Sequence, residues 1–461
     1  MVCLGNPRCL HIRILSRMES AWRRYKRHTR PNLEEKIEMA EKAETTLKIE
    51  NLLLRFYTYE GVVEALDGVN LEIRPGEILG LVGETGCGKS VTSLSVMQLV
   101  PNPGVIEGGK LLYNLNGQMV DLAKQKDDFL RRIRGDEISM VFQEPRVYLN
   151  PVYSVEYQIG EVLLQHRKNE LIKNALEEVK TNHAKKLEAK IKKIEEKIEK
   201  LKVKGEKENK AKIEEVRRKI EKLKGEHPQS FTIKIYEKML RNPDARSIRI
   251  LSRIPVVNRF RKWLKLAVRK EVVNILKGMQ IADPERVVDM YPHELSGGMA
   301  QRVMIAMALV CNPTLLICDE PTTNLDVTVQ AQILELIRAL RERFKSSILY
   351  ITHDLGVVAQ LCERVTVMYA GNVVESADVN SLFREPLHPY TKALLESIPR
   401  PGHELRSIPG TVPSLISPPR GCRFHTRCQY AMPICENQKP SFIEVKKDHY
   451  VACHLYGGYS K

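Results

Sequence analysis

The segment GETGCGKS, residues 83–90, constrains the fold of this chain more than any other feature. It follows an apolar run that ends at Val82 and opens into a helical pattern that continues to Val100. Glycines at this spacing let backbone N–H groups close around phosphate oxygens, and the helix N-terminus adds positive potential. Lys89 would reach the β- and γ-phosphates, and Ser90 would bind Mg²⁺. An ordinary glycine turn is the alternative. The predicted nucleotide-contacting residues of this loop are Gly83, Glu84, Thr85, Gly86, Cys87, Gly88, Lys89, Ser90 and Val91.

Short apolar runs that end in polar residues recur along the chain. They are typical of buried strands that deliver functional side chains at their C-terminal ends. Segments with helical period lie between them, and this alternation predicts an α/β fold. Together with the phosphate loop at 83–90, it predicts a fold of the P-loop NTPase class. The expected strand segments are 47–56, 69–83 with a Pro-Gly turn inside it, 138–143, 315–321 and 347–354. The expected helices include 300–310 and 329–344.

The run LLICDE, residues 315–320, ends in two carboxylates. We predict that Asp319 orients Mg²⁺ and its waters and that Glu320 polarises the attacking water, because general-base work needs a carboxylate within hydrogen-bond reach of that water. The segment LSGGMAQR, residues 295–302, precedes a helix and offers a second set of N–H groups at Ser296, Gly297 and Gly298. A simple Ser-Gly-Gly helix start would also explain it. One nucleotide does not need two phosphate cradles from one chain, so we expect two chains arranged head-to-tail.

These motifs, together with VFQEP (141–145), LLICDEPTTNLD (315–326) and ITHD (351–354), occur in an order that resembles the nucleotide-binding domain of an ABC transporter. The resemblance covers about 47–380, apart from one insertion, and implies ATP and Mg²⁺ as cofactors. It implies that Glu320, His353 and Gln143 are catalytic, with Gln143 also near Mg²⁺ and His353 on the γ-phosphate. Ser296 to Gly298 would close onto ATP held by the opposite protomer, and Asn324 to Asp326 would form the dimer contact. Tyr59 is the first choice for stacking on adenine, and Tyr57 is the second.

The C-terminal segments EPLHPYTKALLESIPRP (385–401) and IPGTVPSL (408–415) resemble ATP-binding subunits of dipeptide and oligopeptide importers. The resemblance implies an ATP-hydrolysing, peripheral subunit on the cytoplasmic face of the membrane. Its partners would be a second ATPase subunit (a copy or a paralogue), two integral membrane permeases and an extracytoplasmic solute-binding protein. Peptides are the expected cargo, and nickel and oligosaccharides are the alternatives. The triplet from His388 to Tyr390 is expected to be an ordinary loop with an aromatic anchor.

Four cysteines cluster near the C-terminus, at positions 422, 428, 435 and 453. Their spacing lacks the close pairs of structural zinc sites. Four thiolates at such spacing are compatible with a [4Fe–4S] cluster, and the resemblance includes importer subunits that carry one. A zinc ion or four reduced thiols are the alternatives, and His425 or His454 could replace a ligand. The candidate cluster ligands are Cys422, Cys428, Cys435 and Cys453.

The stretch 190–225 carries no catalytic pattern. Its apolar residues alternate at spacings of three and four with charges between them, and this pattern is typical of a coiled coil. A turn is expected near Gly205 and Asn209, which predicts an antiparallel hairpin whose longer arm starts near Leu171 and has about 30 residues, or roughly 45 Å. It interrupts the helical subdomain, so roughly 167–266 is predicted to be an insertion.

The net charge of +16 is concentrated in residues 1–30, 167–224 and 245–270. Such basic appendages suit lipid headgroups or nucleic acid, although a solvated Lys/Glu helix face has the same composition. Residues 246–270 resemble an interfacial amphipathic segment, or a basic helix packed on its own domain. A DNA-associated ATPase similar to the SMC proteins is the rival interpretation, but the expected tip, Lys204-Gly205-Glu206, lacks the Cys-x-x-Cys hook of the repair members. We therefore do not favour a nucleic-acid partner.

The predicted architecture has three parts. Residues 1–45 form a basic extension, 46–380 an ABC ATPase domain with a helical subdomain and the inserted hairpin, and 381–461 a small C-terminal lobe with the four cysteines. No apolar run reaches about 18 residues, so a transmembrane helix is not expected.

Overall fold

The computed structural model describes residues 44–203, 210–225, 231–242, 261–323, 325–398 and 407–457. The chain divides into two compact units, Met1–Gln143 with Asn312–Lys461, and Glu144–Cys311. Several expectations lie outside the described residues: the N-terminal extension up to residue 43, the turn and tip at 204–209, the basic stretch up to residue 260, and Asn324. Among the described residues, no helix has the length and apolar character needed to cross a bilayer.

The first unit contains two sheets. A four-stranded antiparallel sheet has the order β2 (Gly61–Ile73), β1 (Leu47–Thr58), β4 (Gly104–Leu115), β5 (Gln118–Asp121). An eight-stranded sheet has the order β11 (Phe442–Lys446), β12 (His449–Ala452), β10 (Asn372–Asp378), β9 (Arg364–Tyr369), β3 (Ile78–Val82), β8 (Ser347–Thr352), β7 (Leu315–Asp319), β6 (Ile138–Val141). The α/β class predicted from the sequence is confirmed.

Five neighbouring strands of the larger sheet, from β9 to β6, run parallel. Every residue of β3, β6, β7 and β8 is buried, which explains why these strands read as continuous apolar runs in the sequence. Because the strands are parallel, their carboxyl ends lie at the same edge of the sheet. The phosphate loop follows β3, and Asp319 ends β7, so both are delivered to that edge.

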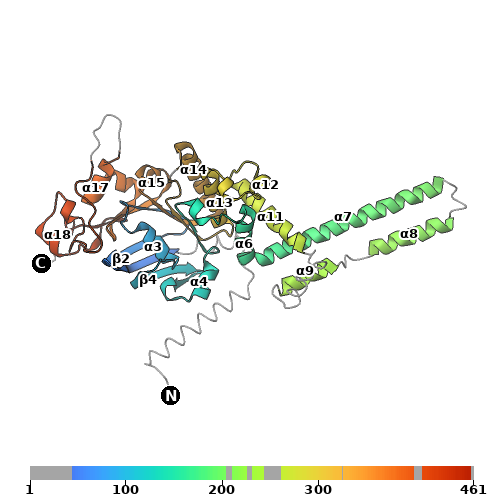
Figure 1. The fold of residues 1–461 in the computed structure, drawn as a ribbon, viewed down its shortest axis with the longest axis horizontal. Helices are drawn as coiled ribbons and strands as arrows, with labels where there is room; N and C mark the ends of the chain where they lie inside the picture. The colour runs from blue at the N-terminus through green and yellow to red at the C-terminus, as the bar shows by residue number, and fades with distance from the viewer. Residues whose placement is uncertain are drawn as a thin grey trace, which may run out of the picture. The chain divides into compact units, whose positions relative to one another are not determined.

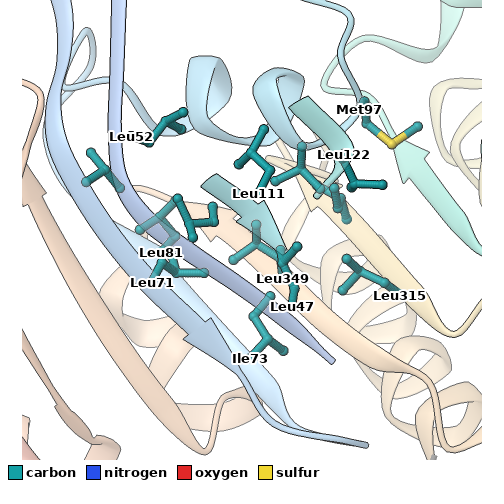
Figure 2. Packing of buried hydrophobic residues seen from close by; sticks show 14 of the residues in the cluster. Leu47, Leu52, Leu71, Ile73, Leu81, Met97, Leu111, Leu122, Leu315 and Leu349 are labelled. Atoms are coloured by element: carbon teal, nitrogen blue, oxygen red, sulfur yellow. The ribbon is translucent and has the colours of Figure 1, made fainter. Parts of the chain in front are cut away.

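A buried hydrophobic cluster joins the two sheets of this unit (Figure 2). Leu47 and Leu71 contribute from the antiparallel sheet, and Leu81 and Leu349 contribute from the parallel strands. Three of these, Leu47, Leu81 and Leu349, have no exposed surface. Truncating such a leucine to alanine typically costs about 2–5 kcal/mol. This core therefore holds β3, β7 and β8, and with them the chain segments that follow each strand.

The helices of the first unit flank the sheets or connect strands. They are α3 (Lys89–Val96), η1 (Leu122–Lys124), α4 (Asp127–Ile133), α14 (Val327–Phe344), α15 (Leu355–Leu361), α16 (Val379–Arg384), α17 (Pro389–Glu396), η4 (His425–Arg427) and α18 (Pro433–Asn437).

The C-terminal region adds strands to the main sheet. β12 pairs antiparallel with β10, with Val451 opposite Glu375, and β11 pairs with β12. The segment that the sequence predicts as a separate part, 381–461, therefore extends the eight-stranded sheet of the ATPase unit. The physical reason is that β10 offers an edge whose backbone hydrogen bonds β12 completes.

The second unit is helical. Its helices are α5 (Pro145–Tyr148), α6 (Val155–His166), α7 (Lys168–Val203), α8 (Lys210–Gly225), α9 (Phe231–Arg241), α11 (Arg261–Gly278), α12 (Pro284–Val287), η3 (Pro292–Glu294) and α13 (Gly297–Leu309).

The inserted segment has two packed regions. Far along α7, Ile198 packs with Ile220 of α8, and α8 runs beside this part of α7 (Figure 1). At the other end of α7, Leu176 belongs to a buried cluster with Tyr236 of α9 and Ala267 of α11. α7 has 36 residues and begins at Lys168, so it is longer than the arm predicted from the sequence. The expected end of the insertion at 266 falls inside α11, which continues without a break.

Candidate active site

The phosphate loop joins β3 to α3, as predicted from its glycines. Lys89 is 5% exposed, and its ammonium donates to the carbonyl oxygens of Gly83 (2.8 Å) and Glu84 (3.1 Å). The N–H of Cys87 also donates to the Glu84 carbonyl, at 3.3 Å. Cys87 is 1% exposed, and this burial raises the pKa of its thiol. The loop is thus compact, because the Lys89 side chain folds back onto the backbone of the loop.

Two glycines of the loop have no room for a side chain. A Cβ on Gly83 would lie 2.2 Å from the Met368 carbonyl oxygen, and a Cβ on Gly88 would lie 2.7 Å from Leu66 Cδ2. Gly88 also has a φ of 102°, which an L-residue rarely adopts. The Met368 backbone at Gly83, and the Leu66 side chain together with the positive φ at Gly88, therefore explain why glycine stands at these positions.

Ser90 and Asp319 meet at the edge of the sheet. The Ser90 hydroxyl donates to Asp319 Oδ1 at 3.1 Å. Burial raises the pKa of Asp319 to about 6, and the neighbouring Glu320 charge acts in the same direction, while Ser90 and Lys89 oppose the rise. Hydroxyl and carboxylate oxygens are the ligands that Mg²⁺ prefers. The donor set therefore fits the Mg²⁺ site predicted at Ser90 and Asp319.

Glu320 lies at the centre of a group of polar side chains. Its Oε2 accepts from Gln143 Nε2 at 3.0 Å and from the Thr323 hydroxyl at 3.1 Å, and its Oε1 lies 3.2 Å from His353 Nδ1. The Glu320 side chain is 13% exposed and that of His353 is 56% exposed. Glu320 has a φ of 44°, a conformation that costs a non-glycine residue about 1–3 kcal/mol and that is common at functional sites.

The structure therefore brings together the residues predicted to be catalytic. One unit contains the buried ammonium of Lys89 and the Ser90–Asp319 pair. It also contains the Glu320 carboxylate with its neighbouring amide and imidazole groups. This arrangement can bind a triphosphate and a divalent cation and activate a water molecule beside them. It is the chemistry of a nucleoside-triphosphate hydrolase.

Other predicted site residues belong to other segments of the chain. Ser296 caps α13 and accepts from the Met299 N–H at 3.3 Å, in the second unit. Asp326 caps α14 and accepts from the Val329 N–H at 2.9 Å. Gly297 and Gly298 open α13. Tyr59 is 97% exposed in the turn after β1, while Tyr57 is 52% exposed and donates to Glu107. The roles assigned to these residues stay predictions.

Two residues that the sequence did not reveal hold the phosphate loop. The Tyr390 hydroxyl accepts from the Glu84 N–H at 2.9 Å, and Arg427 forms an ion pair with the Glu84 carboxylate. Tyr390 belongs to α17, which His388 caps, rather than to an ordinary loop. No local signal links Arg427 to Glu84 because the two are 343 positions apart in the chain.

The four C-terminal cysteines line one small cavity, together with His388, His425 and His454. Burial, together with the nearby cysteines, raises the pKa of Cys422 to about 11, although the backbone hydrogen bond from Phe424 acts in the opposite direction. The thiols are thus of the right number and kind for a metal centre. Among the residues that the structure describes, however, no three His, Cys, Asp or Glu side chains are arranged to hold a metal ion. The cluster predicted from the sequence is therefore not supported by this arrangement.

Comparison with known families gives two matches. The ABC transporter family matches residues 66–195 and 187–323. The family described as "Oligopeptide/dipeptide transporter, C-terminal region" matches residues 374–435. The matched regions contain the phosphate loop, the two carboxylates at the end of β7 and part of the cysteine lobe.

Curated relatives align over most of the chain. A probable peptide ABC transporter ATP-binding protein of Sinorhizobium fredii is 37% identical over 89% of this chain and 95% of its own length. A dipeptide transport ATP-binding protein of Bacillus subtilis is 37% identical over 89% and 95%, and an oligopeptide transport ATP-binding protein of the same species is 38% identical over 89% and 88%. A solved dimeric structure of a bacterial ABC transporter cassette aligns at 21% identity with a TM-score of 0.45, and covers 72% of this chain and 99% of that chain.

The chain belongs to the ABC transporter family, in the branch of oligopeptide and dipeptide transporter ATP-binding subunits. It is an ATPase, and the family predicted from the order of its motifs is confirmed.

Proposed function

We propose that this ATPase energises a binding-protein-dependent importer of dipeptides or oligopeptides. It acts as a peripheral subunit on the cytoplasmic face of the membrane, with a second ATPase subunit, two permeases and an external solute-binding protein. The single observation that carries the proposal is the combination, in one chain, of the catalytic group around Glu320 and a C-terminal region of the oligopeptide/dipeptide transporter type. Nickel and oligosaccharides are the alternative cargoes.

In the proposed mechanism, ATP binding closes two such subunits and hydrolysis reopens them. Lys89 binds the β- and γ-phosphates, and Ser90, Asp319 and Gln143 would hold Mg²⁺, which neutralises phosphate charge. Glu320 polarises the attacking water, and His353 contacts the γ-phosphate. Ser296, Gly297 and Gly298 of one chain close onto ATP held by the other, and Asp326 lies in the dimer contact. Tyr59 stacks on adenine.

The experiment that tests the assembly is a pull-down of the tagged chain from the native membrane fraction in mild detergent, followed by mass spectrometry. Multi-spanning permeases and a sister ATPase should co-purify, and the receptor associated with those permeases identifies the cargo in a ligand-binding screen. Recovery of the chain with nucleic acid or DNA-repair proteins, and without permeases, would instead support the DNA-associated ATPase.

We propose that the insertion forms an antiparallel coiled-coil hairpin, and that its basic segment, residues 246–270, contacts lipid headgroups or a permease beside the membrane. The packing of Ile198 against Ile220 supports the hairpin, and the cluster of Leu176 with Tyr236 holds the other end of α7 to α9. Flotation of the full chain on anionic liposomes at moderate salt tests the lipid contact. The control is a variant in which the exposed basic residues Arg261, Lys262 and Lys265 of this segment are replaced by glutamine. Equal flotation of the two proteins would contradict the lipid contact.

We propose, as the finer interpretation of the cysteine lobe, that its four thiols bind a [4Fe–4S] cluster, with zinc and free thiols as alternatives. The convergence of four cysteines on one cavity supports this. Anaerobic purification followed by iron, sulfide and zinc analysis distinguishes the three states. Protein with neither metal, and with four thiols that react with a thiol reagent after unfolding, would leave the free-thiol form.

A further inference from the structure

Arg427 is a buried cation that reaches from the cysteine lobe to the phosphate loop. It lies in η4, between Cys422 and Cys428, and its side chain is 4% exposed. Its Nη1 donates to Glu84 Oε2 at 2.8 Å, and its Nη2 donates to Glu84 Oε1 at 3.2 Å. A two-pronged pair of this kind defines the orientation of both groups. Burial alone would lower the pKa of Arg427, but the hydrogen bonds to Glu84 and Tyr369 outweigh this effect and raise it.

Two further hydrogen bonds hold Arg427. The Arg427 Nε donates to the Pro409 carbonyl at 2.7 Å, and its Nη1 donates to the Tyr369 hydroxyl at 3.2 Å. The guanidinium carbon lies 5.7 Å from the centre of the Tyr369 ring. Arg427 is therefore held by the lobe and by β9 at the same time, so its position at Glu84 does not depend on that one pair.

Glu84 in turn controls the shape of the loop. Its carboxylate is held by Arg427, its N–H donates to the Tyr390 hydroxyl at 2.9 Å, and its carbonyl accepts from Lys89 Nζ at 3.1 Å. All three polar parts of this one residue thus have defined partners. The lysine that serves the phosphates rests on a residue whose other two contacts come from the C-terminal region.

The same C-terminal elements pack around the cysteines. Phe424 is 3% exposed, and its ring centre lies 5.1 Å from that of Tyr369 and 5.4 Å from that of Tyr390. Phe424 and His388 also line the cavity of the four cysteines. An aromatic cluster therefore connects the thiols with both groups that hold Glu84.

We propose that Arg427 is a positioning residue for ATP binding, which joins the four-cysteine lobe to the phosphate loop through Glu84. Without Arg427, the Glu84 carboxylate loses its main partner, and the loop N–H groups and Lys89 are no longer preorganised for phosphate. Preorganisation of this kind governs ligand affinity and transition-state binding. Because the anchors of Glu84 belong to the lobe, the order of the lobe sets the affinity for ATP.

The first test measures the dissociation constant for ATP, the KM and the kcat of the full chain with Arg427→Met. We expect ATP binding to weaken and KM to rise roughly tenfold or more, with a smaller change in kcat, because the phosphate loop is no longer preorganised for its ligand. Arg427→Lys keeps the charge but loses the fork, so its effect should be intermediate. Unchanged ATP affinity in Arg427→Met would overturn the proposal.

Arg423→Met is the matched control. Arg423 is a lobe arginine whose side chain is 5% exposed and which pairs with Glu64 and Asp67 of β2, not with the phosphate loop. The Arg423→Met variant should lower thermal stability as Arg427→Met does, but it should weaken ATP binding much less. If both variants weaken ATP binding equally at equal loss of stability, the effect is general undocking of the lobe and the specific role of Arg427 is refuted.

Two further variants test the pathway itself. Arg427→Met and Glu84→Gln are measured alone and combined. If Arg427 acts through Glu84, the double variant should bind ATP no more weakly than the single variant that has the lower ATP affinity. Additive losses would refute that route. Replacing Cys422 and Cys435 by serine together should raise KM in the same direction and should not add to Arg427→Met. A folded cysteine variant with wild-type ATP affinity would refute the link to the lobe.

Discussion

Replacing Glu320 with glutamine tests the centre of the catalytic group. The Glu320 carboxylate accepts from Gln143 at 3.0 Å and from Thr323 at 3.1 Å, both at Oε2. Glutamine has nearly the same shape, and its amide oxygen can accept from the same two donors. The substitution therefore removes the charge and the basicity without opening a cavity, so the free energy of unfolding should change little.

The expected loss is catalytic. General-base assistance typically contributes 10²- to 10⁴-fold to a rate, which corresponds to about 3–5 kcal/mol of activation free energy at about 1.4 kcal/mol per tenfold. Glu320 makes no described contact with Lys89 or Ser90, so ATP affinity should stay within a few-fold of wild type. Because the variant binds ATP but does not hydrolyse it, ATP should stay trapped. The trapped ATP should keep two copies of this chain, or this chain and a paralogue, in the closed dimer.

The assay is steady-state phosphate release at saturating Mg²⁺ and ATP, together with equilibrium ATP binding and the oligomeric state by size exclusion. Thr323→Val is the matched control. This variant removes one hydrogen bond to Glu320 Oε2 but keeps the carboxylate base. The activation free energy should therefore rise by about 1 kcal/mol, which lowers the rate roughly fivefold. Hydrolysis by Glu320→Gln within about threefold of wild type would refute the assignment of Glu320 as the base.

Three other variants give independent checks. Burial lowers the pKa of His388 to about 4, so unfolding takes up a proton there as the pH falls from about 6.5 towards 4. Stability should fall over that window by up to about 3 kcal/mol, and His388→Asn, which retains a helix-capping acceptor, should flatten that part of a melting-temperature profile. Gly83→Ala would place a Cβ 2.2 Å from the Met368 carbonyl oxygen, and nucleotide titration should detect no ATP binding. Met239→Ala in α9 should lower the stability of the cluster that joins α7, α9 and α11 by about 2–5 kcal/mol. Amide exchange in α7 and α9 should become faster while the ATP affinity stays unchanged. No change in exchange would contradict that packing.

The chemistry of the site could be predicted from the sequence because each motif is local. The turn at GETGCGKS needs its glycines within one loop, and Asp319 and Glu320 follow directly on an apolar strand. Parallel strands of one sheet then necessarily bring their carboxyl ends to one edge. Motif order over the whole chain also determined the family, which the comparisons confirm.

Only the tertiary structure decided which distant segments meet. Whether β12 completes the edge of β10, whether α11 continues past residue 266, and which arginine pairs with Glu84 depend on packing that no local pattern records. The pair of Arg427 with Glu84 forms because the fold brings a buried guanidinium and a partly buried carboxylate together. The sequence by itself thus determined that this chain is an ATPase of the peptide-transporter branch, while the fold decided that its C-terminal cysteine lobe holds the phosphate loop.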